Sequence, residues 1–255
     1  MSIGESILKG FGVAKKSSGL MLVLFVFGFV FTLLNLFLAP PAATANPNQP
    51  PPPALIAVGA VFILLTIYFQ GGSLAYVRDR VKTGSASLAN FTSGGAKYYG
   101  RLFLLGLVVA LIIGVFVLLA ALSSAFLQSI PALAIPLAIV FGALGLSFVV
   151  LLFFSPYAAV VDEKGVGASI RLSMKLVKKN ILPLLGIVVV LVLIGFGLGL
   201  ILGAIFAGVS LVVKAEMPAS VIIALLSNLV NAFLGLVVTG AFTSFYLSLS
   251  DRNNA

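Results

Sequence analysis

Long stretches without a charged side chain constrain this sequence more than any other feature. Residues 17–77 and 102–161 contain no Asp, Glu, Lys or Arg, and neither do residues 180–213 and 217–250. A helix needs about 20 apolar residues to cross the hydrocarbon of a bilayer. The two longer stretches therefore predict two membrane spans each, and the two shorter ones predict one each. The predicted spans lie at roughly residues 19–38, 54–76, 102–127, 133–158, 182–212 and 220–248.

The composition excludes a water-soluble domain. Hydrophobic residues make up 61% of the 255 residues and charged residues 8%, against about 45–50% and about 25% in soluble domains. A span must satisfy its backbone polar groups internally, so it is a helix or a strand of a closed barrel. Residues 187–194 lack the polar–apolar alternation of a barrel strand. We therefore predict an all-α, polytopic fold, a single integral membrane domain over residues 1–255.

Proline marks the predicted turns between spans. Residues 39–53 read APPAATANPNQPPPP and predict an extended, polyproline-like loop. Further turns are expected near 128–131 and at 214–218. The basic segment from Lys9 to Lys16, the apolar stretch after it and Ala43-Thr44-Ala45 also fit a signal peptide with its cleavage site. The apolar stretch exceeds the roughly 7–15 residues of a signal core, which favours a retained span.

The positive charge lies on one side of the predicted topology. The chain has 15 Lys and Arg and 6 Asp and Glu, a net charge of +9, and only Lys214 falls on the opposite side. Cytoplasmic loops carry the excess of Lys and Arg, so both termini are expected in the cytoplasm. This topology accounts for the charge without a nucleic-acid partner. Anionic lipid headgroups at the cytoplasmic face are the predicted partners.

The three basic segments resemble one another. Each unit reads as a cytoplasmic amphipathic helix followed by a transmembrane hairpin, which predicts three pseudo-repeats at about 1–80, 81–162 and 163–255. Superposition of the segments aligns Ile7 with Leu88 and Ile170, and Lys16 with Lys97 and Lys179.

The third segment has the clearest amphipathic pattern. Its basic face consists of Arg171, Lys175 and Lys178, which share one side of a helix. Such a helix is predicted to lie in the membrane interface with its cations toward headgroups and cytosol. A simple connector along the membrane is the alternative. The apolar stripe consists of Val166, Ile170, Met174, Val177 and Ile181.

The same region carries a family resemblance. Residues 157–180, YAAVVDEKGVGASIRLSMKLVKKN, resemble the signature P-x-hydrophobic-E-G-x-x-x-A-hydrophobic-K/R-x-S-x-x-L-x-K-x-N. This signature belongs to a prokaryotic six-helix membrane family that includes the membrane domain of some glycerophosphodiester phosphodiesterases and YciC-like inner-membrane proteins. Ser169-Ile170 departs from its usual Ala-Leu pair. The resemblance implies a six-helix fold in a prokaryotic cytoplasmic (inner) membrane. It implies no reaction, because no phosphodiesterase domain is present.

Residues for catalysis are scarce. The chain has no His and no Cys, and Tyr is the only ionisable residue inside the predicted spans. Proton relays and buried catalytic sites in membranes normally need such residues. We therefore predict no enzyme, no cofactor and no metal site. Asp79, Asp162 and Asp251 are expected to cap helices or pair with neighbouring cations.

Small and amide side chains are the remaining candidates within the spans. Gly195, Gly199 and Gly203 form one row, as do Gly106, Ala110 and Gly114. Both rows are expected to pack against other helices of the chain, with a homodimer seam as the alternative.

Asn228 and Asn231 share a face of the last span and are expected to point inward, because unpaired amides in hydrocarbon are costly. They would form interhelical hydrogen bonds or line a polar path.

Two functions follow from these features. The first is a non-enzymatic scaffold, lipid-interacting or accessory module with basic amphipathic helices on the cytoplasmic leaflet. The alternative is a channel or facilitator for a neutral or lipidic solute. The candidate binding residues are Asn228, Asn231, Arg171, Lys175 and Lys178.

Overall fold

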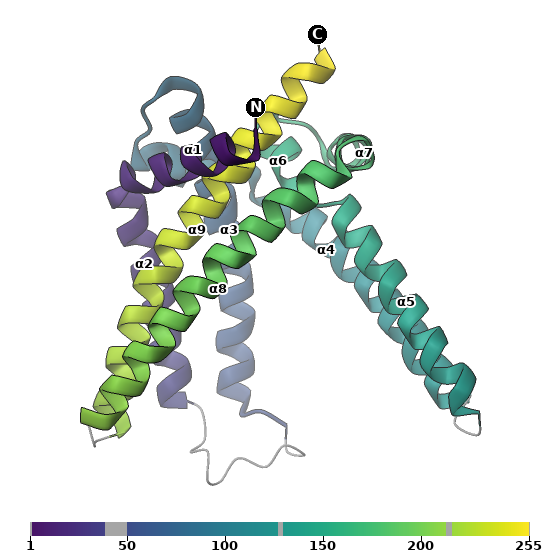
Figure 1. The fold of residues 1–255 in the computed structure, drawn as a ribbon, viewed down its shortest axis with the longest axis horizontal. Helices are drawn as coiled ribbons and strands as arrows, with labels where there is room; N and C mark the ends of the chain where they lie inside the picture. The colour runs from purple at the N-terminus through teal and green to yellow at the C-terminus, as the bar shows by residue number, and fades with distance from the viewer. Residues whose placement is uncertain (1, 39–49, 127–129, 213–215, 255) are drawn as a thin grey trace. The chain divides into compact units, whose positions relative to one another are not determined.

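The structure is a computed structural model that describes residues 2–38, 50–126, 130–212 and 216–254. Figure 1 shows the helices in chain order. Their bounds are α1 Ile3–Lys15, α2 Ser18–Leu38, α3 Pro53–Thr83, α4 Leu88–Phe126, α5 Pro131–Leu151, α6 Ser155–Val160, α7 Val166–Lys179, α8 Ile181–Val212 and α9 Glu216–Asn254.

The predicted all-α fold with six spans is confirmed. Six described helical segments are long and apolar enough to cross a membrane, and no strand occurs in the described ranges. They are Ser18–Leu38, Pro53–Thr83, Leu88–Phe126, Ala132–Val160, Ile181–Val209 and Pro218–Asp251. Most of the predicted proline-rich loop, Ala43-Thr44-Ala45 and the centres of the other two predicted turns lie outside the described residues.

The spans present large apolar side chains to their surroundings. Leu111 is 69% exposed, Ile139 66% and Leu193 62%. Such a surface is unfavourable in water, at roughly 25 cal/mol per Å² of apolar area, and is the normal surface of a helix in lipid. The chain is therefore a multi-pass membrane protein.

The described residues form two compact units. The first comprises Met1–Ala96 and Leu185–Ser248, and the second comprises Lys97–Leu184 and Leu249–Ala255. The first unit contains α1, α2, α3, the beginning of α4 and most of α8 and α9. The second contains the rest of α4 together with α5, α6 and α7. These two units do not test the three predicted pseudo-repeats, which concern similarity between segments of the sequence. The repeats stay a prediction.

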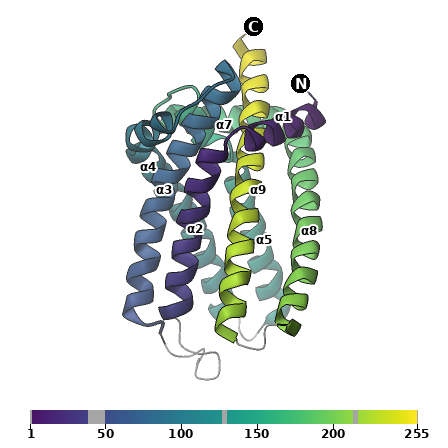
Figure 2. The ribbon, with the colours of Figure 1, turned by 90° about the vertical axis from the view of Figure 1, so that its left-hand side faces the viewer.

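In the first unit, α1 lies across α9 (Figure 2), and glycine on both helices permits the close approach. A Cβ at Gly240 would lie 2.9 Å from the Gly10 Cα and 3.1 Å from the Val13 Cβ. The core of this unit lies beside the crossing. It consists of Val13, Ala14, Leu20, Tyr76, Val77, Phe91, Leu236 and Val237.

The glycine rows singled out in the sequence do not make such contacts. A Cβ at Gly106, Gly114, Gly195, Gly199 or Gly203 would meet nothing within 4 Å. Within each of the two units, therefore, these rows do not make the expected close contacts with other helices. Spacing places glycines on one face of a helix, but it does not say which way that face points. A seam between two copies stays a prediction.

In the second unit, the fourth span is broken near its end, and α7 repairs the break. The helix stops at Leu151, and α6 begins at Ser155. The Ser173 hydroxyl of α7 donates to the Leu151 carbonyl at 2.8 Å and accepts from the Phe154 N–H at 3.0 Å. Ser173 is fully buried. One side chain thus satisfies two backbone groups that the break would leave unpaired.

The sequence predicts an amphipathic helix followed by a separate span in each unit, but α4 combines the two in one helix. It runs unbroken from Leu88 to Phe126, whereas Lys16-Ser17 separates α1 from α2 and Asn180 separates α7 from α8. No proline or capping contact interrupts α4 between Lys97 and Leu102.

The aligned basic segments share one burial pattern. The pattern does not include the first aligned set, because Ile7 is buried, Leu88 exposed and Ile170 half-buried. Further along, three sets of equated positions are buried together, and the next two sets are exposed together. The buried sets are Gly10, Phe91 and Ser173; Val13, Gly94 and Leu176; and Ala14, Gly95 and Val177. The exposed sets are Lys15, Ala96 and Lys178; and Lys16, Lys97 and Lys179.

We expect Gly240→Leu to lower the free energy of unfolding by about 1–3 kcal/mol, because the new side chain must displace α1. Gly199→Leu is the matched control and should cost nothing, since its side chain enters open space. Thermal unfolding in detergent measures both. Equal destabilisation of the two variants would contradict the close packing of α1 against α9 at Gly240.

We expect Ser173→Ala to destabilise the protein by about 2 kcal/mol, because it leaves a buried carbonyl and a buried N–H without partners. Ser147→Ala is the control, since the exposed Ser147 hydroxyl bonds only to the Ala143 carbonyl of its own helix. Chemical or thermal unfolding in detergent should separate the two variants. Similar stabilities of Ser173→Ala and Ser147→Ala would show that the Ser173 hydrogen bonds do not stabilise the break in the fourth span.

Candidate functional site

The helix α7 is divided into three faces. Its buried face contains Ser169, Ser173, Leu176 and Val177, which pack within the second unit. The basic face, Arg171, Lys175 and Lys178, is exposed, as the amphipathic pattern predicts. None of the three cations forms a hydrogen bond or ion pair with another described residue.

The predicted apolar stripe lies between these two faces. Val166, Ile170 and Met174 are half-buried, Val177 is fully buried and Ile181 is exposed. Of this stripe only Val177 reaches the buried face, where Ser169, Ser173 and Leu176 lie beside it. The helix α7 therefore has a buried face, a half-buried apolar stripe and an exposed basic face.

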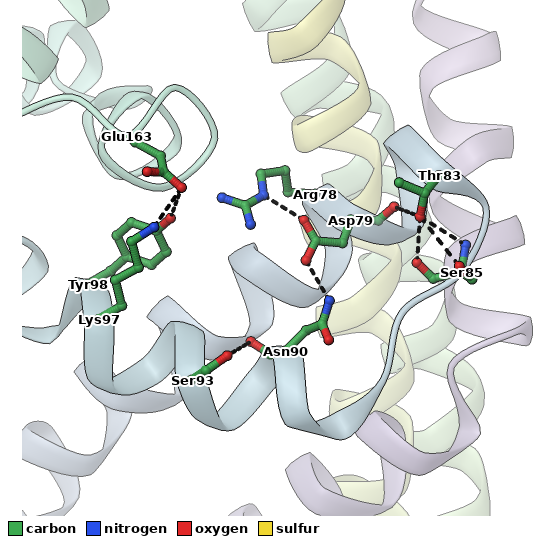
Figure 3. A network of polar contacts seen from close by, with 9 residues as sticks. All are labelled: Arg78, Asp79, Thr83, Ser85, Asn90, Ser93, Lys97, Tyr98 and Glu163. Atoms are coloured by element: carbon green, nitrogen blue, oxygen red, sulfur yellow. Dashed lines mark hydrogen bonds and ion pairs between the residues drawn. The ribbon is translucent and has the colours of Figure 1, made fainter.

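A loop anchor fixes the beginning of α7. Glu163 precedes the helix with a φ of 55°, a left-handed conformation that non-glycine residues seldom adopt. Its carboxylate accepts from the Tyr98 hydroxyl at 2.6 Å and from Lys97 Nζ at 2.8 Å (Figure 3). Its carbonyl accepts from Arg101 at 2.8 Å. Three side chains of α4 therefore hold a strained loop residue in place.

A second polar network lies in the first unit. The Asp79 carboxylate accepts from Arg78 Nε and from the Asn90 amide, each at 2.7 Å (Figure 3). Asp79 thus pairs with a neighbouring cation as expected and also ties the end of α3 to α4. In the second unit, Asp162 accepts from Ser250 at 3.3 Å. No three His, Cys, Asp or Glu side chains gather into a metal-binding group within the described ranges.

The helix α1 begins with a capping box. The Ser2 hydroxyl accepts from the Glu5 N–H at 3.2 Å, and the Glu5 carboxylate accepts from the Ser2 N–H at 2.7 Å. The hydrogen bond from the Ser2 backbone holds the pKa of Glu5 below its ordinary value. Lys9 and Lys15 are exposed, and Leu8 is 72% exposed beside them.

The two asparagines of the last span have different surroundings. Asn228 is half-buried, and its amide donates to Thr32 of α2 at 2.9 Å and to the Ala224 carbonyl at 2.8 Å. Gly28 makes room for it, since a Cβ there would lie 2.5 Å from Asn228 Oδ1. Asn231 is exposed. The structure therefore does not bring the two amides together, and Asn228 joins α9 to α2.

The sequence did not point to Thr32, Tyr98, Glu163 or the pairing of Ser173 with the broken span. The break itself had a signal, because Pro156 follows Ser155 at the start of α6. Ser173 coincides with the serine of the signature, but the signature does not reveal its partners. Which groups pair depends on which helices become neighbours.

A family model matches residues 1–249, described as a domain of unknown function, DUF7847. The chain belongs to the DUF7847 family. Comparison with curated proteins and with solved structures finds no match. The DUF7847 match assigns no reaction or ligand, and kinship with phosphodiesterase-associated or YciC-like membrane proteins stays a prediction.

We expect Asn228→Leu to lower the free energy of unfolding by about 1 kcal/mol, because the interhelical bond to Thr32 is lost. Asn231→Leu is the control and should leave stability unchanged, since that side chain is exposed. Thermal unfolding in detergent is the measurement. If Asn228→Leu kept full stability, its structural role would be refuted and a polar lining favoured.

Proposed function

We propose that this DUF7847 protein is a non-enzymatic, multi-pass module of a prokaryotic cytoplasmic membrane that gathers anionic lipids around basic interfacial helices. The observation that carries the proposal is the exposed basic face of α7, whose cations have no protein partner in the described structure. An unpaired cation at a membrane surface is most stable beside a lipid phosphate.

The three faces of α7 support this role. Burial of the serine face fixes the rotation of the helix about its axis, so that Arg171, Lys175 and Lys178 cannot turn toward the protein. Each basic residue near an anionic surface contributes about 1 kcal/mol. Three together give about 3 kcal/mol, which corresponds to roughly a hundredfold local preference for anionic over neutral headgroups.

The connectivity supports one membrane side for α1 and α7. Four spans separate them along the chain, and an even number of crossings returns the chain to its starting side. The excess of Lys and Arg favours the cytoplasmic side for both. Exposed Leu8, Lys9 and Lys15 then give α1 an apolar and a basic surface at the same leaflet.

The absence of His and Cys from the sequence supports a non-enzymatic role. A solute path through the spans, the alternative, gains no support from Asn228, because Thr32 and a backbone carbonyl already accept from its amide.

The test is lipid selectivity in nanodiscs of mixed phosphatidylcholine and phosphatidylglycerol, read with spin-labelled forms of each lipid. We expect wild type to select phosphatidylglycerol, and R171Q/K175Q/K178Q to lose that selectivity several-fold, because the headgroups lose their counter-charges. R171K/K175R/K178R is the control that keeps the charge and should keep the selectivity. High salt should weaken it in wild type. Unchanged selectivity in the neutralised variant would overturn the proposal.

A further inference from the structure

A basic pocket lies in the first unit, between the C-terminal half of α1 and the end of α3. Its volume is about 240 Å³. It holds three cations and no carboxylate. The lining residues are Lys9, Gly12, Val13, Lys16, Arg80, Val81 and Gly84.

The three cations of this pocket have no anionic partner. Lys9, Lys16 and Arg80 form no ion pair with another described residue. The Arg80 guanidinium donates to the Lys16 carbonyl, which fixes its position beside the end of α1. Its Nε is buried and has no acceptor in the described part of the chain. Donor capacity therefore remains, and a buried donor without an acceptor is costly.

Nearby carboxylates are engaged elsewhere. Glu5, one turn before Lys9, accepts from the Ser2 N–H in the capping box. Asp79, beside Arg80 in the sequence, accepts from Arg78 and Asn90. Neither carboxylate lines the pocket. The positive charge therefore stays uncompensated within the unit.

Glycines open the pocket to a ligand. Lys9 and Gly12 share one side of α1 with Lys16, the residue that caps its C-terminus, since the three are spaced by three and four residues. A Cβ at Gly12 or at Gly84 would meet nothing within 4 Å. Gly84 has a φ of 76° and ends α3 with a bond from its N–H to the Arg80 carbonyl. At these two positions of the lining, therefore, no side chain fills the space beside the cations.

We propose that this pocket binds a phosphate group. Guanidinium and ammonium groups are the side chains that proteins use for phosphate, with Arg donating in a fork and Lys acting as a point charge. Three cations match a phosphate ester better than a single carboxylate. The phosphate belongs either to the headgroup of a membrane phospholipid or to a free phosphate ester. The proposal rests on the proposed function where the source is lipid, because it assigns one defined lipid site within that module.

The experiment uses the full chain and separates the two sources. In one arm, the protein in neutral detergent is titrated calorimetrically with inorganic phosphate and with glycerol 3-phosphate. In the other, native mass spectrometry counts phosphatidylglycerol molecules retained by protein released from phosphatidylcholine nanodiscs that contain a small fraction of that lipid. Saturable binding in the first arm identifies a free phosphate ester, and binding confined to the second identifies a headgroup.

Two variants remove the site in different ways. Arg80→Gln removes the central cation and should weaken binding about tenfold. Gly12→Leu places a side chain in the pocket, touches no neighbour at its Cβ and keeps all three cations. Gly12→Leu therefore tests whether a ligand needs the space in the pocket, even if Arg80→Gln perturbs the fold. The matched control is K15Q/K82Q, which removes two exposed cations from the same helices without altering the lining.

The pocket is supported if both variants lose binding and K15Q/K82Q retains it. Absence of binding in both arms overturns the proposal, and so does an equal loss in the control, which would indicate diffuse attraction. The variant R171Q/K175Q/K178Q distinguishes the proposed role of α7 from the proposed phosphate pocket. Pocket binding should survive in that variant, so a failure of the α7 role leaves the pocket intact, and a failure of the pocket leaves the α7 selectivity intact.

Discussion

The structure depends on one constraint, that a backbone inside hydrocarbon must satisfy its own polar groups. Continuous helices meet it along the spans. Where the fourth span breaks between Leu151 and Ser155, Ser173 meets it from another helix. The same serine holds α7 against its unit, so the repair of a transmembrane break also sets the rotation of a surface helix. The basic face of α7 is exposed because its opposite face is committed to this bond.

The spans, their number and the amphipathic character of α7 could be predicted from the sequence, because each depends on composition and local spacing alone. The contacts between helices could not. Gly199 and Gly240 look alike in sequence, yet one faces open space and the other lies against Gly10. Asn228 and Asn231 are only three residues apart, yet Asn228 is half-buried on the side that continues to buried Ala232, and Asn231 is exposed. Such differences depend on helix rotation and on neighbours distant in the chain.

The candidate site was predictable to a similar degree. The cations of α7 were identified, because charge on an amphipathic helix must face away from the apolar side. The anchor at Glu163 was not, because a left-handed backbone and three partners on α4 leave no mark in local sequence. The basic pocket was likewise invisible, since it joins Lys9 and Lys16 to Arg80 across two spans. We propose two uses for the positive charge: it orients the chain in the membrane, and it offers sites to anions.

The unbroken helix α4 has a mechanical consequence. It contains 39 residues, about 58 Å of helix, which is nearly twice the thickness of the hydrocarbon. An unbroken helix of this length curves only gently, so a tilt at one end is transmitted along its whole length. In contrast, α1 and α7 are separate from the spans that follow them, because the helix is interrupted at Lys16-Ser17 and at Asn180. A change in bilayer thickness that tilts the third span would therefore also tilt the amphipathic beginning of α4, whereas α1 and α7 are not continuous with their spans.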